Sequence, residues 1–358
     1  MTKRARFLVL AVWLLLATPL VSFAHVKWFA QWSFADPPSP IGAVINPLVL
    51  GLLALTMAAL AVAVFIDARL QDMGWYRQVI AWFNARRDYA TLVLRIGLGM
   101  TLMLSWQGDT LLSPDLKLSN PAIGWLEFVL ALLLIFPRTT PIAGAGTLAL
   151  YGIGILEFGA FYMLDYFIFV GVALYLIVAG AQNPRVRALR IPALYFSVGF
   201  SLMWVGLEKL IYPQWGLDIL AQQPVLTLGL DPAFFLTSAA FVELALGYLF
   251  IIGLLERPMA IVVTLVFFTT TLVFGKVEVI GHTIIHAALI VFLLEGTKAS
   301  PYPAPINLTR STPRRMAFAA GNFVLLLVVL GLPYELMAQA THSTYQTVFL
   351  PIARLLWG

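Results

Sequence analysis

Two of the four histidines in the chain, His282 and His286, lie four residues apart in an otherwise apolar stretch, KVEVIGHTIIHAALIVFLLEG (276–296). If this stretch is helical, both imidazoles project from one face, and Glu278 lies on the same face one turn earlier. Two imidazoles and a carboxylate so arranged suit metal ligation, a proton relay, or hydrogen bonding to a quinone carbonyl. A fourth interpretation is structural, with both rings hydrogen-bonded to neighbouring helices. All four interpretations stay open at this point.

Several other ionisable residues also lie within or next to apolar stretches. Such a side chain at the centre of a membrane-spanning helix costs about 2.5–3.5 kcal/mol, so each one marks a candidate functional position. We expect one polar pocket to hold these groups, because clustering hides them from lipid. For Lys209 two arrangements are open: an internal ion pair with Glu243, or an interfacial lysine whose ammonium reaches water. The pocket candidates are Asp109, Glu127, Asp165, Glu208, Lys209, Glu243 and Glu278.

The N-terminus has a basic segment, then an apolar run, and then Ser22-Phe23-Ala24, with small residues at the positions that signal peptidase reads. We therefore expect residues 1–24 to be a signal peptide, with an uncleaved signal anchor as the alternative. Cleavage would make His25 the first residue, and its amino group, imidazole and neighbouring amide would chelate Cu(II) well. His25, His282 and His286 are thus candidate metal ligands. Alternatively, the aromatic residues within 28–32 anchor the chain at the membrane surface.

The composition is that of a membrane protein. Hydrophobic residues make up 61% of the 358 residues, charged residues make up 11%, and the mean hydropathy is +0.91. Soluble domains contain about 45–50% apolar and about 25% charged residues. We therefore predict an all-α polytopic membrane protein, with two parallel-repeat four-helix bundles and flanking transmembrane helices. The expected spans are 45–66, 90–112, 122–136, 142–162, 163–181, 191–211, 233–254, 258–275, 278–295 and 317–338.

The basic residues are concentrated in alternate connections between these spans, so the net charge of +5 indicates membrane topology and not a nucleic-acid surface. The same bias predicts that residues 25–44, 109–121 and 212–232 face the periplasm of a bacterial inner membrane, together with the polar pocket. The chain has no cysteine, which excludes disulfides, thiolate metal sites and cysteine-held iron–sulfur clusters within it. It also has no Walker loop, Rossmann fingerprint or HExxH motif.

Two parts of the chain resemble each other. The stretch VGFSLMWVGLEKLIYP (198–213) aligns with LGMTLMLSWQGDTLLSP (98–114), which places Glu208 on Asp109. Further along, Glu243 aligns with Glu127 and His282 with Asp165, so we expect a duplicated unit.

The predicted organisation is a signal peptide (1–24), a periplasmic segment with the first transmembrane helix and a cytoplasmic loop (25–89), two four-helix units (90–190 and 191–296), and a cytoplasmic loop with the last transmembrane helix and a periplasmic amphipathic tail (297–358).

The second unit resembles the DoxX-like family of small four-helix membrane proteins, which includes the DoxD-type subunits of thiosulfate:quinone oxidoreductases. The resemblance rests on Gly206-Leu-Glu-Lys209 near the end of its first helix, on Glu243 in its second helix, and on the short Glu-Arg-Pro connection at 256–258. In the first unit, Gln107-Gly108-Asp109-Thr110 stands at the equivalent place, so the lysine is missing. The resemblance implies a four-helix fold for each unit and a quinone-interacting or anchoring role in an oxidoreductase.

Three functions are consistent with these patterns. The first is a redox-associated membrane protein whose pocket interacts with a quinone and whose partner is a periplasmic redox protein. The second is a copper-handling membrane protein that works with a periplasmic metal-handling partner. The third is a structural or assembly protein without a ligand. The lipid bilayer is an expected partner in every case, and nucleic acid in none.

Overall fold

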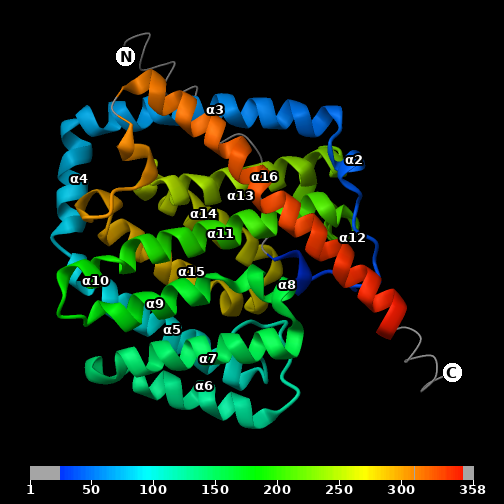
Figure 1. The fold of residues 1–358 in the computed structure, drawn as a ribbon, viewed down its shortest axis with the longest axis horizontal. Helices are drawn as coiled ribbons and strands as arrows, with labels where there is room; N and C mark the ends of the chain where they lie inside the picture. Colours follow the sequence, from blue (N-terminus) through cyan, green and yellow to red (C-terminus); the bar gives the residue numbers. More distant parts are fainter. Residues whose placement is uncertain (1–24, 310, 350–358) are drawn as a thin grey trace.

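The computed structural model describes residues 25–309 and 311–349 (Figure 1). It confirms the predicted all-α polytopic class, and these residues contain no β-strand. The predicted signal peptide, 1–24, lies outside the described residues.

In chain order the helices are η1 (Val26–Trp28), α2 (Ile41–Val44), α3 (Pro47–Asp72), α4 (Gly74–Asn84), η2 (Arg87–Tyr89), α5 (Ala90–Gln107), α6 (Pro121–Leu133), η3 (Pro137–Thr139), α7 (Thr140–Phe158), α8 (Ala160–Met163), η4 (Leu164–Tyr166), α9 (Ile168–Ala179), α10 (Pro184–Ala188), α11 (Arg190–Ile211), α12 (Pro213–Gln222), η5 (Pro224–Thr227), α13 (Pro232–Ile252), α14 (Glu256–Phe274), α15 (Lys276–Leu294), η6 (Thr297–Ala299), η7 (Pro305–Leu308), α16 (Thr312–Thr344) and the π-helical turn η8 (Tyr345–Phe349).

Each of the ten expected spans has helical structure at its position. Eight spans in the described part of the chain are long and apolar enough to cross a bilayer, and the bent pair Ala160–Tyr166 and Ile168–Ala179 makes nine if it counts as one. Helix α6 is shorter, at 13 residues. It begins where the side chain of Asn120 accepts a hydrogen bond from the Ala122 N–H, with Pro121 in the first turn.

The expected boundary at 162/163 lies a few residues too late, and the span expected at 163–181 is part of a bent pair of helices. Helix α7 ends at Phe158, because Gly159 adopts φ +89°, a conformation that glycine tolerates. The following segment bends by 63° between η4 and α9. At the bend, the N–H of Ile168 donates to Ser201 Oγ on α11, 2.9 Å away. The bend places Asp165 next to Lys27 and Tyr166 next to Trp28.

The start of the predicted amphipathic tail, within 297–358, also needs correction. Helix α16 continues to Thr344 and is followed directly by the π-helical turn η8, so the first part of the tail prolongs the last spanning helix. The extension beyond the expected end at 338 is mostly polar, and the Nδ1 of His342 in it lies 3.1 Å from the carbonyl oxygen of Phe34. Residues 350–358 lie outside the described residues.

The helices of the two predicted units pack in the same order. In the first unit α5, α6, α7 and α9 each contact the next, and α9 returns to α5; in the second, α11, α13, α14 and α15 do the same. The units join where α9 packs on α11 and α5 packs on α15. Helices α3 and α16 pack on each other and on α13, outside the second unit (Figure 1).

Glycines permit the closest crossing in the second unit. A Cβ added to Gly199 of α11 or to Gly247 of α13 would lie 2.5 Å from the carbonyl oxygen of the other residue. Since lipid tails are as apolar as helix surfaces, tight backbone packing of this kind is what holds spanning helices together.

The two ends of the bundle differ in charge. We call the end that carries residues 25–46, 108–120 and 212–231 the site end (right in Figure 1). Among the described residues, its basic side chains are Lys27, Lys117, Lys209 and Lys276. The described arginines all belong to the opposite end, which carries helices α4 and α10.

Candidate functional site

The N-terminal segment of the described chain folds back into the bundle at the site end. Val26 and Lys27 in the short helix η1 are only 1% and 4% exposed. Trp28 packs directly on Gly281 of α15, because a Cβ at that position would lie 1.9 Å from the indole ring. The indole N–H of Trp28 donates to the hydroxyl of Tyr166, 3.1 Å away. Gly281 therefore provides the space in which this segment docks.

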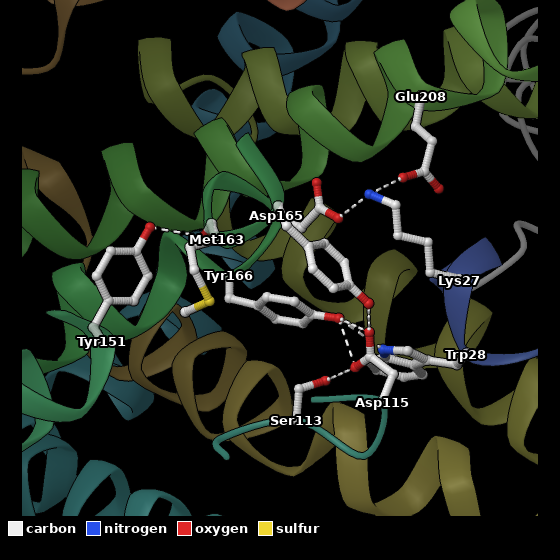
Figure 2. Close-up of polar contacts among 10 residues, drawn as sticks. Lys27, Trp28, Ser113, Asp115, Tyr151, Met163, Asp165, Tyr166 and Glu208 are labelled. Carbon is white, nitrogen blue, oxygen red and sulfur yellow. Dashed lines mark hydrogen bonds and ion pairs between the residues drawn. The ribbon is translucent and has the colours of Figure 1, made fainter. Parts of the chain in front are cut away.

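Lys27 bridges two buried carboxylates that come from different units (Figure 2). Its ammonium lies 2.6 Å from Asp165 Oδ2, in the first unit, and 2.7 Å from Glu208 Oε2, in the second. It also lies 4.7 Å from the centre of the Tyr162 ring. Burial by itself would lower the pKa of Lys27, but the two carboxylates outweigh it and raise that pKa above its ordinary value. Lys27 therefore stays charged and ties the units to the N-terminal segment.

A second polar network lies beside this bridge, on the loop between α5 and α6. Tyr166 donates to the carboxylate of Asp115 at 2.7 Å, and Ser113 donates to the same group at 2.6 Å. The hydroxyl of Tyr162 contacts the other oxygen of Asp115 (Figure 2). Leu112 in this loop adopts φ +62°, and its N–H donates to Glu127 of α6 at 2.8 Å. The loop is thus held to the bundle by two carboxylates.

One further ion pair and one close histidine–carboxylate contact are buried in the second unit. Lys209 lies 2.7 Å from Glu243 Oε2, so the structure shows the internal pair and not the interfacial lysine. His282 Nδ1 lies 2.6 Å from Glu278 Oε2, one turn earlier on α15, and Glu278 also accepts from the hydroxyl of Thr270 at 3.1 Å. These side chains are nearly or fully buried.

A small cavity lies between the two units beneath the N-terminal segment. Its volume is about 70 Å³, and His25, Asp165, Tyr166, Glu243 and His282 contribute its ionisable lining. The remaining lining is largely apolar and comes mainly from α9, α11 and α15. Such a volume accommodates a few water molecules, each of which needs about 10–15 Å³, and the lining offers them hydrogen-bond partners.

His286 lies in a different place, the wall of an apolar groove between α5, α14 and α15. The groove has a volume of about 440 Å³. Three of its other lining residues, Ile96, Met100 and Phe268, are exposed by 53%, 53% and 57%, so the groove faces the lipid side of the bundle. The imidazole of His286 stacks on Phe268 and lies 6.4 Å from His282, centre to centre. Within the described part of the chain it has no hydrogen-bond partner.

The three candidate metal ligands do not converge. His25 and His282 each contact the ring of Trp28, at 5.0 and 5.1 Å between ring centres, whereas His286 turns toward Phe267 and Phe268. Residues 25–309 and 311–349 contain no group of three or more His, Asp or Glu residues placed to hold a metal ion. Burial lowers the pKa of His25 well below its ordinary 6.5, and the charges of Lys27 and Lys209 lower it further.

Five of the seven pocket candidates lie together in the structure, and Asp109 and Glu127 lie apart from them. Asp165, Glu208, Lys209, Glu243 and Glu278 are all buried toward the site end. Asp109 is exposed at the left-handed start of its loop, with φ +51°, and takes no part in the ion pairs. Glu127 is buried too, but against the backbone of Leu112 instead of a cation.

Sequence reasoning missed the roles of Lys27 and Asp115. Lys27 directly precedes the aromatic residues that were expected to anchor the chain at the membrane surface, and its partner Asp165 is 138 residues away. Asp115 lies in a loop without periodicity, so nothing in the pattern marks it. The tyrosines at 162 and 166, one helical turn apart beside Asp165, were the available signal for a polar network at this turn.

No protein-family model, no curated protein and no solved structure matches the chain. The DoxX-like resemblance of 191–296 therefore stays a prediction, and the assignment of function depends on the geometry of the site.

Proposed function

We propose that this multi-pass membrane protein binds the head group of a lipid-soluble quinone in the groove between α5, α14 and α15. The observation that carries the proposal is the imidazole of His286, which lies in the wall of an apolar groove on the lipid-facing side. A quinone reaches its site through the bilayer, and it needs an apolar slot with a donor for a carbonyl oxygen. His286 supplies a ring N–H of that kind.

The size of the groove supports a quinone ring in this place. Its volume of about 440 Å³ falls in the range of about 300–1,000 Å³ that is common for small-molecule sites. The buried cavity, at about 70 Å³, is smaller than the roughly 150 Å³ cavity that admits benzene. The ring therefore belongs in the groove, and the buried cavity suits water.

The histidine pair and Glu278 form a route for protons between these two spaces. Reduction of a quinone to a quinol adds two electrons and two protons. His286 lies in the wall of the groove, His282 lines the cavity between the units, and His282 Nδ1 lies 2.6 Å from Glu278 Oε2. Since an imidazole nitrogen can donate or accept a proton, the pair is suited to exchange protons with the bound head group. The electrons would come from a partner redox protein.

The proposal includes an orientation of the protein in the membrane. The arginine-rich end of the bundle would face the cytoplasm of a bacterial inner membrane, and the site end the periplasm, where a redox partner would dock. The DoxX-like resemblance of the second unit supports the same role, that of a quinone-interacting or anchoring subunit.

The test is quinone binding by the purified protein in nonionic detergent, measured by quenching of tryptophan fluorescence with a short-tailed benzoquinone. His286→Leu keeps the groove apolar and filled but removes the donor. An unsatisfied carbonyl costs about 1–3 kcal/mol, so the dissociation constant should rise about 5- to 150-fold. His342→Gln, on α16 and outside the groove, is the matched control and should bind like the wild type. Equal affinity of His286→Leu and wild type would overturn the assignment.

A further inference from the structure

A second polar pocket lies at the opposite end of the bundle, far from the quinone groove. It has a volume of about 350 Å³ and is formed by the end of α3, one face of α4, the turn between α13 and α14, and residues 296–298. Three cationic side chains line it: Arg77, Arg257 and Lys298. Two acidic residues, Asp67 and Glu256, line it as well.

The two acidic residues are already engaged by other groups. Glu256 accepts hydrogen bonds from the N–H and the hydroxyl of Thr297, the first at 2.9 Å. Asp67 accepts from Gln71 at 2.5 Å and lies 3.5 Å from Arg315. Arg315 therefore balances the charge of Asp67. Thr297 only fixes the carboxylate of Glu256, which offsets part of the positive charge of Arg257 and Lys298. The three cations outnumber this one carboxylate, so the pocket keeps a net positive charge.

The cations are less fully engaged. Arg257 donates to the Leu293 carbonyl at 2.7 Å and to Asn84 Oδ1 at 2.5 Å, which leaves one of its terminal nitrogens without a hydrogen bond. Arg77 and Lys298 are exposed and have no ionic partner among the described residues. Burial, together with nearby Asp67, raises the pKa of Tyr76 to about 12, so its phenol stays a neutral hydrogen-bond donor. The pocket thus presents positive charge and donors.

Helix α4 places this pocket at the membrane surface. Trp75, Val79 and Trp82 are exposed by 57%, 42% and 53% and share one face, as their spacing of four and three residues requires. The residues that line the pocket, Arg77 and Asn84 among them, come from the other face. Figure 1 shows α4 crossing the end of the bundle at a steep angle to α3. Since tryptophan prefers the lipid head-group region, α4 lies in the interface and the pocket lies beside it at the same depth.

We propose that this pocket binds the phosphate group of an anionic phospholipid, such as phosphatidylglycerol. The guanidinium groups of Arg77 and Arg257 match the geometry of phosphate oxygens, and Lys298 adds a point charge at the rim. The acyl chains would run along the apolar side of the bundle, next to α4. A soluble phosphate compound shares the same chemistry, and the experiment must separate the two sources.

The experiment is native mass spectrometry of the full chain released from nonionic detergent with added phosphatidylglycerol or phosphatidylcholine. Each cation near the membrane surface contributes about 1 kcal/mol, so Arg77→Gln with Lys298→Gln should weaken phosphatidylglycerol binding about 30-fold. Arg185→Gln with Arg187→Gln, on α10 at the same end, removes equal charge outside the pocket. This control pair should bind phosphatidylglycerol like the wild type.

Three results would overturn the proposal. The first is equal binding of both lipids by the wild type, and the second is an equal loss in the pocket and control variants. The third is full competition by inorganic phosphate at millimolar concentration, which would identify a soluble anion as the ligand. Both double variants change exposed side chains, so each is expected to fold, and the elution profile in size-exclusion chromatography checks this.

Discussion

Removal of the Lys27 ammonium should strongly destabilise the protein, because it leaves two buried carboxylates without a cation. In Lys27→Met the side chain keeps its length but loses the charge that lies 2.6 Å from Asp165 and 2.7 Å from Glu208. These three side chains are at most 1% exposed, so water does not replace the lost partner. Two buried carboxylates would then face each other without a cation.

The magnitude follows from the cost of neutralising a carboxylate. With an ordinary pKa near 4, protonation at pH 7 costs about 4 kcal/mol, from three pH units at about 1.36 kcal/mol each. Loss of one partner from a buried ion pair typically costs about 3–5 kcal/mol. We therefore expect the free energy of unfolding to fall by about 4 kcal/mol. Because the pKa of Lys27 is raised, the stabilisation by its charge is complete below pH 10.5 and is lost only at higher pH.

The assay is equilibrium unfolding in mixed micelles at pH 7. Lys117→Met removes an exposed lysine at the same end and should change the free energy of unfolding by less than about 0.5 kcal/mol. The triple variant Lys27→Met, Asp165→Asn, Glu208→Gln removes all three charges and should recover most of the loss. If Lys27→Met costs less than about 1 kcal/mol, or the triple variant is no better, the buried bridge does not hold the segment.

Three further changes test the docking of the N-terminal segment and the second ion pair. Gly281→Val should displace Trp28 from α15 and cost about 1–3 kcal/mol, seen as a red shift of tryptophan emission; an unchanged spectrum would contradict the packing. Lys209→Met should lower the free energy of unfolding by about 3–5 kcal/mol, and adding Glu243→Gln should restore most of that loss. Failure of the double variant to recover stability would contradict a buried ion pair between the two residues. The pKa of His25 is lower in the folded protein than in the unfolded chain, so the unfolded chain binds the proton first as the pH falls. The free energy of unfolding should therefore be highest above pH 6.5 and decrease below it. His25→Gln should flatten this part of the stability–pH profile, and an unaltered slope would refute the burial of His25.

The helical periodicity of the sequence predicted part of the candidate site. The spacing of Glu278, His282 and His286 placed all three on one stripe of α15, and the structure has them there. The pair between Lys209 and Glu243 was one of two expected arrangements. What the spacing did not reveal is that His282 and His286 serve different spaces, one the buried cavity and the other the lipid-facing groove.

Composition and hydrophobic runs were enough to determine an all-α polytopic chain and the approximate ends of most of its spans. These features are local, since the length of an apolar run and its period depend only on neighbouring residues. The tertiary structure alone decided which side chains meet. Lys27 reaches Asp165 across 138 residues because the chain bends between η4 and α9 and because Gly281 leaves room for Trp28. Helical periodicity sets the face and depth of a residue within its own helix, but the partner across the interface depends on how closely two backbones approach.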